Sequence, residues 1–234
     1  MSIAENIGRI RDRIQRAARH AARRQEEICL MGVTKTMSPE QVREAYAAGI
    51  RLFGENRVQE FAGKVGALRD LEDAEWHMIG HLQSNKAARV VELFDATESL
   101  DSVRLAEKLN AAAAQLKKKL PVLVEINIGG EEAKSGLAPD SAELDDLLNR
   151  ASQLTFLDFR GLMTVPPYSD NPEHSRPYFR RMRQIRDAIS ARKLPAAGMD
   201  VLSMGMSHDF EVAVEEGSTC VRIGTAIFGK RKTS

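Results

Sequence analysis

The sequence predicts an α/β fold, a single closed (β/α)₈ barrel of the TIM type with an extra helix at the amino terminus. Three observations lead to this prediction. Short apolar runs alternate with helical patterns, as in parallel sheets whose strands are joined by helices. Eight such units fit within 234 residues, which is the usual size of a TIM barrel. Residues 34–39 (TKTMSP), after the first run, lack the glycine-rich phosphate loop expected of the alternative, a doubly wound open sheet.

The eight expected strands are runs of apolar and β-branched residues that end in polar ones. They are residues 28–35, 51–56, 75–81, 93–99, 121–128, 157–165, 200–206 and 220–228. The helical patterns between them include residues 39–48, 102–116 and 177–191. Gly49 and Gly217 stand where helices are expected to end, as capping glycines do. No linker rich in Pro, Gly or Ser divides the chain, so we expect residues 1–234 to form one domain.

Residues 1–27 are expected to contribute a helix that packs on the barrel. An apolar seam runs along this helix at alternating spacings of four and three residues, formed by Ile3, Ile7, Ile10 and Ile14. The many arginines of the segment are accompanied by acidic residues, which argues against a transit peptide or a nucleic-acid-binding arm. Because the seam packs either on the barrel or on a second subunit, we expect a monomer or a weak dimer.

The composition excludes several classes of protein. The net charge is +1, with 34 basic and 33 acidic residues, whereas a dedicated nucleic-acid-binding protein carries a basic excess. No apolar stretch approaches the roughly 20 residues that span a membrane. The two cysteines, Cys29 and Cys220, lie in apolar strand-like runs, and two buried thiols fit a reducing cytoplasm better than a disulfide framework. We therefore expect a cytoplasmic protein.

Lys35 is a candidate for covalent chemistry because it ends the first apolar run. A helix start follows at once, with Ser38 as the N-cap, Pro39 at the first helical position and Gln41 completing a capping box. A lysine at such a junction can face a pocket and form a Schiff base with an aldehyde. Most lysines after strands are solvated instead, so position alone is weak support.

The carboxyl ends of the last two strands carry residues suited to binding an anion. TIM barrels build their active sites at this end and commonly bind phosphate after strands seven and eight. Gly205 and Gly224 let the backbone approach an anion, and three further residues add hydroxyl donors or charge, namely Ser207, Thr225 and Arg222. Since strand one adjoins strand eight in a closed barrel, Lys35 lies near this cradle. An amine beside a phosphate cradle is what pyridoxal 5′-phosphate (PLP) requires.

Several segments resemble the pyridoxal phosphate homeostasis protein family, also called the proline synthetase co-transcribed family. The matching runs are residues 32–60, 76–86, 125–136, 159–165 and 202–229. Within them, FGENRVQE, IGHLQSNK and VRIGTAIFG are the most specific. The resemblance extends from about Ile28 to Lys230 and implies a barrel similar to the amino-terminal domain of alanine racemase. It also implies PLP bound as an internal aldimine on Lys35.

The resemblance further implies roles for the remaining residues of the site. The Ser207 hydroxyl and the backbone of Gly224 and Thr225 would hold the phosphate. Asn56 would lie beside the ring, and Arg222 would face the pyridine nitrogen. Ser203 and Met206 would lie nearby. Each position carries the residue type of the family. Family members are regarded as carriers or regulators of vitamin B6 and amino-acid balance.

The residues favour a carrier over a catalyst, and we assign no catalytic residue and no metal ligand. Racemases need a base on each face of the substrate, and alanine racemase takes one from a second domain. This sequence ends at Ser234, so we expect no such domain. Arg222 cannot accept a proton, so it would leave the ring nitrogen unprotonated and weaken carbanion stabilisation. We expect storage of PLP or its delivery to apo-enzymes. The alternatives are a weak amino-acid racemase or other PLP-dependent enzyme, and a phosphate-binding barrel without PLP.

Overall fold

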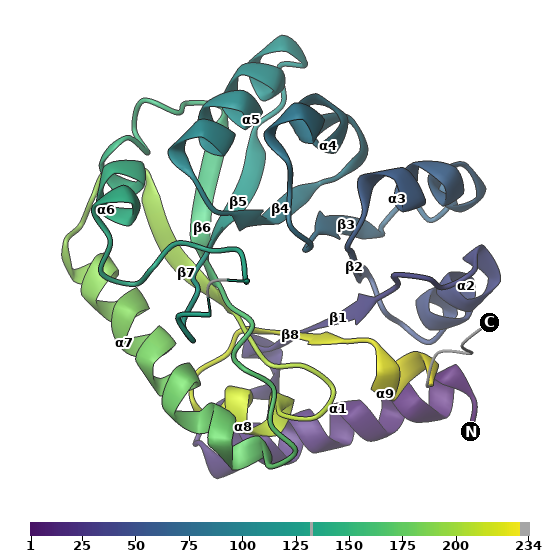
Figure 1. Cartoon of the computed structure of the whole chain (residues 1–234). Helices are drawn as coiled ribbons and strands as arrows, with labels where there is room; N and C mark the ends of the chain where they lie inside the picture. Colours follow the sequence, from purple (N-terminus) through teal and green to yellow (C-terminus); the bar gives the residue numbers. More distant parts are fainter. Residues whose placement is uncertain (132, 230–234) are drawn as a thin grey trace.

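The computed structural model describes residues 1–131 and 133–229 and has the predicted closed barrel. Its strands run in chain order, and every neighbouring pair is parallel, including β8 with β1 (Figure 1). The strands are β1 Cys29–Val33, β2 Leu52–Glu55, β3 Glu75–Met78, β4 Ala96–Leu100, β5 Leu120–Glu125, β6 Leu157–Met163, β7 Ala197–Ser203 and β8 Cys220–Ile223. Lys230 and Ser234, named above, lie outside the described residues.

Helices surround this barrel. The α-helices are α1 Ile3–His20, α2 Pro39–Ala47, α3 Val58–Lys64, α4 Ala87–Leu93, α5 Val103–Gln115, α6 Ala142–Asn149, α7 Arg176–Ala191, α8 Phe210–Glu215 and α9 Thr225–Phe228. Short 3₁₀ turns are Gln25–Glu27, Val65–Leu68, Ser84–Lys86 and Pro172–Ser175. The predicted capping box of α2 is present, because Ser38 accepts from the Gln41 N–H and Gln41 accepts from the Ser38 N–H. Gly49 and Gly217 end α2 and α8 with φ of 88° and 105°.

The predicted strands mostly extend too far at their carboxyl ends. The eighth was expected over residues 220–228, but it ends at Ile223 and residues 225–228 form α9. Short apolar runs fit a buried strand or a buried helical turn equally well by periodicity. Here the run after β8 buries Ile227 completely from within a helical turn. The prediction for residues 225–228 was therefore wrong, and the first turn of α9 falls at the predicted anion site.

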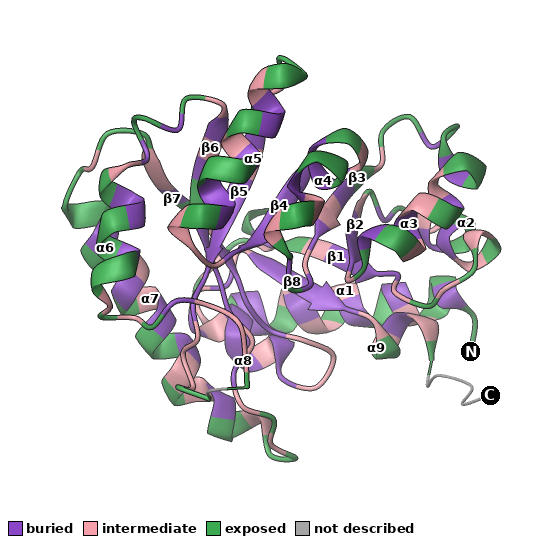
Figure 2. Ribbon diagram, turned by 45° about the horizontal axis from the view of Figure 1, so that its top comes forward, coloured by how far each residue is buried: buried purple, intermediate pink, exposed green. Residues whose placement is uncertain are grey.

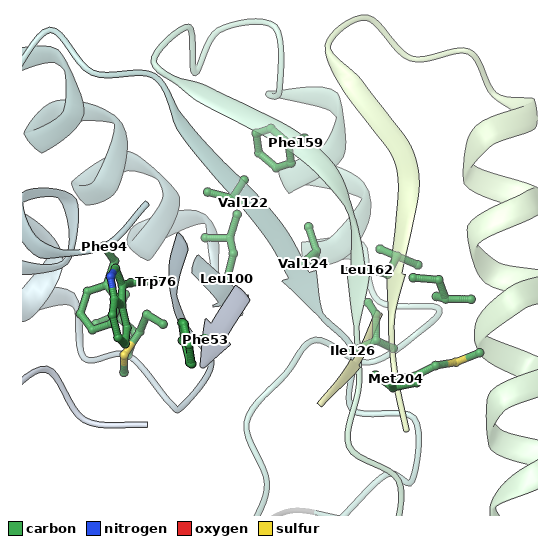
Figure 3. Close-up of a cluster of buried hydrophobic side chains, with 14 of the residues drawn as sticks. Phe53, Trp76, Phe94, Leu100, Val122, Val124, Ile126, Phe159, Leu162 and Met204 are labelled. Atoms are coloured by element: carbon green, nitrogen blue, oxygen red, sulfur yellow. The ribbon is translucent and has the colours of Figure 1, made fainter. Parts of the chain in front are cut away.

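The main apolar core lies between the barrel and its helices. Phe53 of β2 stacks on Trp76 of β3 with ring centroids 4.8 Å apart, and Phe61 of α3 covers Trp76 at the same separation. Figure 3 shows Phe53 and Trp76 together with aliphatic residues of β4 to β6, including Val124 and Leu162. Because side chains alternate across a strand, the residues between these positions face the barrel interior. The strands can therefore bury one face and still present polar groups inside the barrel.

Helix α1 covers the outside of the barrel beside α8 and α9 (Figure 1). Its four seam isoleucines are buried, and the Asn6 side chain donates to the Ile227 carbonyl at 2.8 Å. Figure 2 shows the same arrangement around the barrel, with buried inner helix faces and exposed outer faces. Among the described residues, no helix combines the length and hydropathy that crossing a membrane requires. The amino-terminal helix is shorter than the expected residues 1–27 and ends at His20.

Candidate functional site

Lys35 lies in a tight turn just beyond β1. The Met37 N–H donates to the Thr34 carbonyl at 3.0 Å, and Thr36 between them has a φ of 64°. Lys35 itself is half-buried. Since β1 pairs with β8 up to the Gly32–Ile223 register, Lys35 lies at the same end of the barrel as the chain that follows β8. The predicted adjacency of strands one and eight is confirmed.

Two loops at the same end of the barrel as Lys35 form a shelf suited to an anion, which we call the anion shelf and define as residues 206–208 and 224–226. The Ser207 Oγ accepts a hydrogen bond from the Ala226 N–H at 3.2 Å and so joins the loop after β7 to the first turn of α9. First-turn N–H groups have no partners within their own helix. Gly224 precedes that turn, and the Thr225 side chain is exposed at its start. The shelf therefore combines a hydroxyl with helical N–H groups, the donor set that phosphate prefers.

Gly224 leaves space open at this shelf. Among the described residues, the three atoms nearest to a Cβ built on Gly224 all belong to Val33 and lie at 3.4 Å or more, which is ordinary van der Waals contact. The φ of Gly224 is −109°, which any residue adopts. Packing against the nearest described atoms therefore does not demand glycine at this position. A bound group on the open side of the loop would account for it.

Gly205 has a different role from the one predicted. Its φ is 96°, and an added Cβ would lie 2.5 Å from the Ala213 Cβ on α8. Glycine is therefore required for packing against α8, and the expectation that Gly205 admits an anion has no support in its contacts. The neighbouring loop is braced by buried Asp209, whose carboxylate accepts from the Met206 N–H at 2.7 Å and from the Ser175 hydroxyl at 3.1 Å. This bracing fixes half-buried Met206 and the start of the shelf.

Arg222 belongs to a hydrogen-bonded chain through the barrel interior. Its Nη1 donates to the Ser203 Oγ and its Nη2 to the Thr164 carbonyl, both at 2.7 Å. Ser203 in turn donates to the Glu98 Oε2 at 2.6 Å, and the Glu98 Oε1 lies 2.9 Å from the His77 Nδ1. Arg222 and Glu98 are only 4% and 2% exposed. The guanidinium thus bonds inside the barrel, and its predicted contribution of charge to the anion shelf has no support in these contacts.

The local electrostatics favour the charged forms of Glu98 and Arg222. Burial alone would raise the pKa of the Glu98 carboxyl, but the hydrogen bond and charge of His77, with Arg222 and Ser203, outweigh burial and lower that pKa. The Arg222 guanidinium is charged at any relevant pH. Two of its N–H groups are engaged with Ser203 and Thr164, and a guanidinium has five. The pair is a buried, mutually compensated cation and anion.

The predicted residues divide into groups at the same end of the barrel. Lys35 and Asn56 follow the neighbouring strands β1 and β2, and a Cβ on Gly80 would lie only 2.3 Å from the Asn56 carbonyl oxygen, so the chain after β3 packs closely on Asn56. Ser203 contacts Arg222 directly, and Ser207 contacts the loop that holds Gly224 and Thr225. Sequence reasoning assigned no role to Glu98. The available signal was a carboxylate at the centre of a fully buried strand, Ala96–Leu100.

A cavity of about 770 Å³ opens at the opposite, amino-terminal end of the barrel. Its lining includes Cys29, His77, Glu98 and Cys220. Glu98 therefore faces this cavity while its hydrogen bonds lead to Arg222 through Ser203. Both cysteines are free thiols, and Cys29 is exposed, contrary to the prediction of two buried ones, because it is the first residue of β1 at the open end.

Known proteins resemble the chain over its whole length. Residues 6–232 match the family model for the alanine racemase N-terminal domain. A pyridoxal phosphate homeostasis protein of Aquifex aeolicus (strain VF5) is 46% identical, with 99% of this chain and 100% of that protein covered. The structure of PipY of Synechococcus elongatus PCC7942 with PLP bound has a TM-score of 0.84 at 36% identity, covering 97% of this chain and 100% of that one. Alanine racemase of Clostridium difficile 630 shares the fold, with a TM-score of 0.74 at 16% identity over 100% of this chain and 58% of that one.

Proposed function

Because the chain belongs to the pyridoxal phosphate homeostasis protein family, we propose that it binds PLP through a Schiff base on Lys35 and serves in the homeostasis of that cofactor. The phosphate would rest on the anion shelf, held by the Ser207 hydroxyl and by backbone N–H groups of Gly224 and Thr225. Asn56 would lie beside the ring, with Arg222 directed at the ring nitrogen and Ser203 and Met206 supporting the site.

The observation that carries this proposal is the bond between the Ser207 Oγ and the Ala226 N–H. This hydrogen bond joins the loops after β7 and β8 beside the strand that neighbours β1, and these two loops are the ones proposed to hold the phosphate. Lys35 therefore lies at the same end of the barrel as the proposed phosphate site. The contacts of Gly224 add support, because among the described residues the three atoms nearest to an added Cβ lie at ordinary van der Waals distances.

When bound, PLP supplies an aldehyde that reacts with amines and a ring that withdraws electrons. The protein supplies the amine of Lys35, the donors of the shelf and the charge of Arg222. A guanidinium paired with a buried carboxylate remains protonated, so Arg222 can donate to the ring nitrogen but cannot protonate it. Full use of the ring as an electron sink normally requires a protonated nitrogen, which favours holding and release of PLP over difficult bond cleavage.

Retention of the cofactor during dialysis tests the holding role. The wild-type protein loaded with PLP should keep its cofactor absorbance after several buffer changes, whereas Lys35→Ala should lose most of it. Lys35→Arg, which keeps the positive charge but forms no Schiff base, is the matched control and should also lose the cofactor. Equal retention by all three proteins would refute a covalent role for Lys35.

Delivery to other proteins needs a separate experiment. We infer that apo-PLP enzymes receive the cofactor in the cytoplasm, where the free thiols of Cys29 and Cys220 stay reduced. The loaded protein mixed with a PLP-free aminotransferase should reactivate it faster than the spontaneous loss of PLP from the loaded protein. Reactivation no faster than that loss would leave storage as the function. Rapid exchange of an amino-acid α-hydrogen for deuterium, dependent on Lys35, would instead support the racemase alternative.

A further inference from the structure

The turn that carries Lys35 has a backbone conformation that its own residues do not favour. The Met37 N–H bonds to the Thr34 carbonyl, so Lys35 and Thr36 occupy the two central positions of a β-turn. Thr36 has a φ of 64°, a value suited to glycine or asparagine at this position and unfavourable for a β-branched residue. Such a conformation persists only where surrounding contacts enforce it.

Two residues of α3, which we call the α3 clamp, provide those contacts. The Glu60 Oε1 accepts from the Thr36 N–H at 2.5 Å. One helical turn later, the Lys64 Nζ donates to the Thr34 carbonyl at 2.8 Å. The α3 clamp therefore consists of Glu60 and Lys64, and it binds the backbone on both sides of Lys35. Residues four apart on a helix share one face, which lets the pair reach both neighbours at once.

The ammonium of Lys64 is fully used in this arrangement. The Lys64 side chain is only 8% exposed, and its Nζ lies 2.7 Å from the Glu55 Oε1 and 3.3 Å from the Glu60 Oε1. With the Thr34 carbonyl these make three acceptors for its three protons. The Thr34 hydroxyl also donates to the Glu55 Oε1 at 2.5 Å. These three acceptors use all three protons of the Lys64 ammonium, so none is available to a ligand. We therefore read Lys64 as a residue that binds the Thr34 carbonyl.

We propose that Glu60 and Lys64 are positioning residues that fix the direction of the Lys35 side chain toward the cofactor. This inference rests on the proposed Schiff base at Lys35. Fixing the peptides before and after a residue fixes the direction of its Cα–Cβ bond. A lysine already aimed at the shelf loses less conformational freedom when it reacts, so capture is faster. Without the clamp, Thr36 relaxes from its positive φ and the amine swings away.

Removing the Thr36 anchor tests the proposal. Glu60→Ala should slow PLP capture, followed by absorbance, about tenfold, the rate factor that corresponds to about 1.4 kcal/mol. Glu60→Gln keeps an oxygen acceptor for the Thr36 N–H and should capture PLP at close to the wild-type rate. The matched control is Glu92→Ala, which deletes an exposed carboxylate of α4 whose partner is Arg89 at 2.6 Å. The control should capture PLP like the wild type.

A second substitution separates positioning from general stability. Glycine adopts a positive φ without strain, so Thr36→Gly added to Glu60→Ala should capture PLP faster than Glu60→Ala alone. A purely structural role for Glu60 predicts instead that capture follows the free energy of unfolding across all variants. Capture by Glu60→Ala at the wild-type rate, or equal losses in Glu60→Ala and Glu92→Ala, would overturn the proposal.

The proposal is also testable without the cofactor. Trace acetylation of the PLP-free protein with acetic anhydride, followed by peptide mass analysis, measures the reactivity of Lys35 directly. Glu60→Ala should change that reactivity relative to other lysines, whereas Glu92→Ala should not. Unchanged acetylation of Lys35 in Glu60→Ala contradicts the clamp. Failure of the wild type to take up PLP would contradict the proposed function, and the acetylation result would still decide on the clamp.

Discussion

The Arg222 guanidinium and the Glu98 carboxylate lie 4.0 Å apart inside the barrel, with the Ser203 hydroxyl bonded to both. This arrangement places a compensated ion pair between the carboxyl end of the barrel, where we propose that PLP binds, and the cavity at the other end. Removing one charge of a buried pair leaves the other without compensation, which is far more costly than losing a neutral hydrogen bond. The pair therefore contributes to the stability of the fold. In the proposed PLP complex, it also keeps a positive charge on Arg222, which would face the ring nitrogen.

Glu98→Gln should lower the free energy of unfolding by about 3 kcal/mol, because Arg222 keeps its charge and loses its counter-charge. Urea unfolding at neutral pH measures this change. Ser203→Ala keeps both charges but removes the hydroxyl bonded to each of them, which should cost about 2 kcal/mol, so it serves as the matched comparison. Equal stability of Glu98→Gln and the wild type would show that the buried charge of Arg222 is compensated elsewhere.

Gly224→Ala should fold like the wild type, because the atoms nearest to its Cβ, those of Val33, lie at ordinary contact distances, but it should bind PLP about tenfold more weakly because the phosphate is proposed to rest against this loop. Thermal unfolding and PLP titration together check both halves of this prediction. The matched variant is Gly205→Ala, which should be destabilised by about 1–3 kcal/mol because its Cβ overlaps Ala213 and its φ is positive. Normal PLP affinity in Gly224→Ala would contradict the placement of the phosphate against Gly224.

Stability should fall in acid partly through Glu216. Burial raises the pKa of this carboxyl, but hydrogen bonds from Arg180 and Arg176 outweigh burial and lower it. A lowered folded-state pKa gives stability that is complete above the unfolded value of about 4.3 and is lost as the pH falls through the folded value. Glu216→Gln should therefore lower the unfolding free energy near neutral pH and flatten its decline in acid.

Urea unfolding across a pH series checks this prediction. Glu92→Gln, at the exposed pair with Arg89, is the control and should keep the wild-type slope. An acid decline that is equally steep in Glu216→Gln and the wild type would assign the loss of stability to other carboxylates.

The fold class was predictable because strand and helix periodicities alternate along the whole chain, and the barrel follows from eight such units. The site was predictable as far as it depends on strand ends, which bring Lys35 near Gly224 once β1 pairs with β8. Prediction from the sequence failed where one pattern of apolar residues fits two different structures. Residues 225–228 are apolar enough for a strand, yet they form α9. Cys29 lies in an apolar run that suggests burial, yet it is exposed because it begins β1 at the open end of the barrel.

The contacts that tertiary packing alone creates were not predictable. Glu60 and Lys64 look like an ordinary surface pair four residues apart, and only the packing of α3 on the end of β1 directs them to Thr36 and Thr34. Gly205 and Gly224 look alike in the sequence. Their neighbours separate a glycine required by α8 from one that leaves space at the shelf.

The central claim, that Lys35 holds PLP beside the anion shelf, is tested most directly by borohydride reduction. The protein is mixed with PLP, reduced, digested and examined by peptide mass analysis. We predict that the mass of one reduced phosphopyridoxyl group appears on the peptide containing Lys35, and that this adduct is absent from Lys35→Arg. A wild-type Lys35 peptide without the adduct, at PLP concentrations that saturate the cofactor absorbance, would contradict the account.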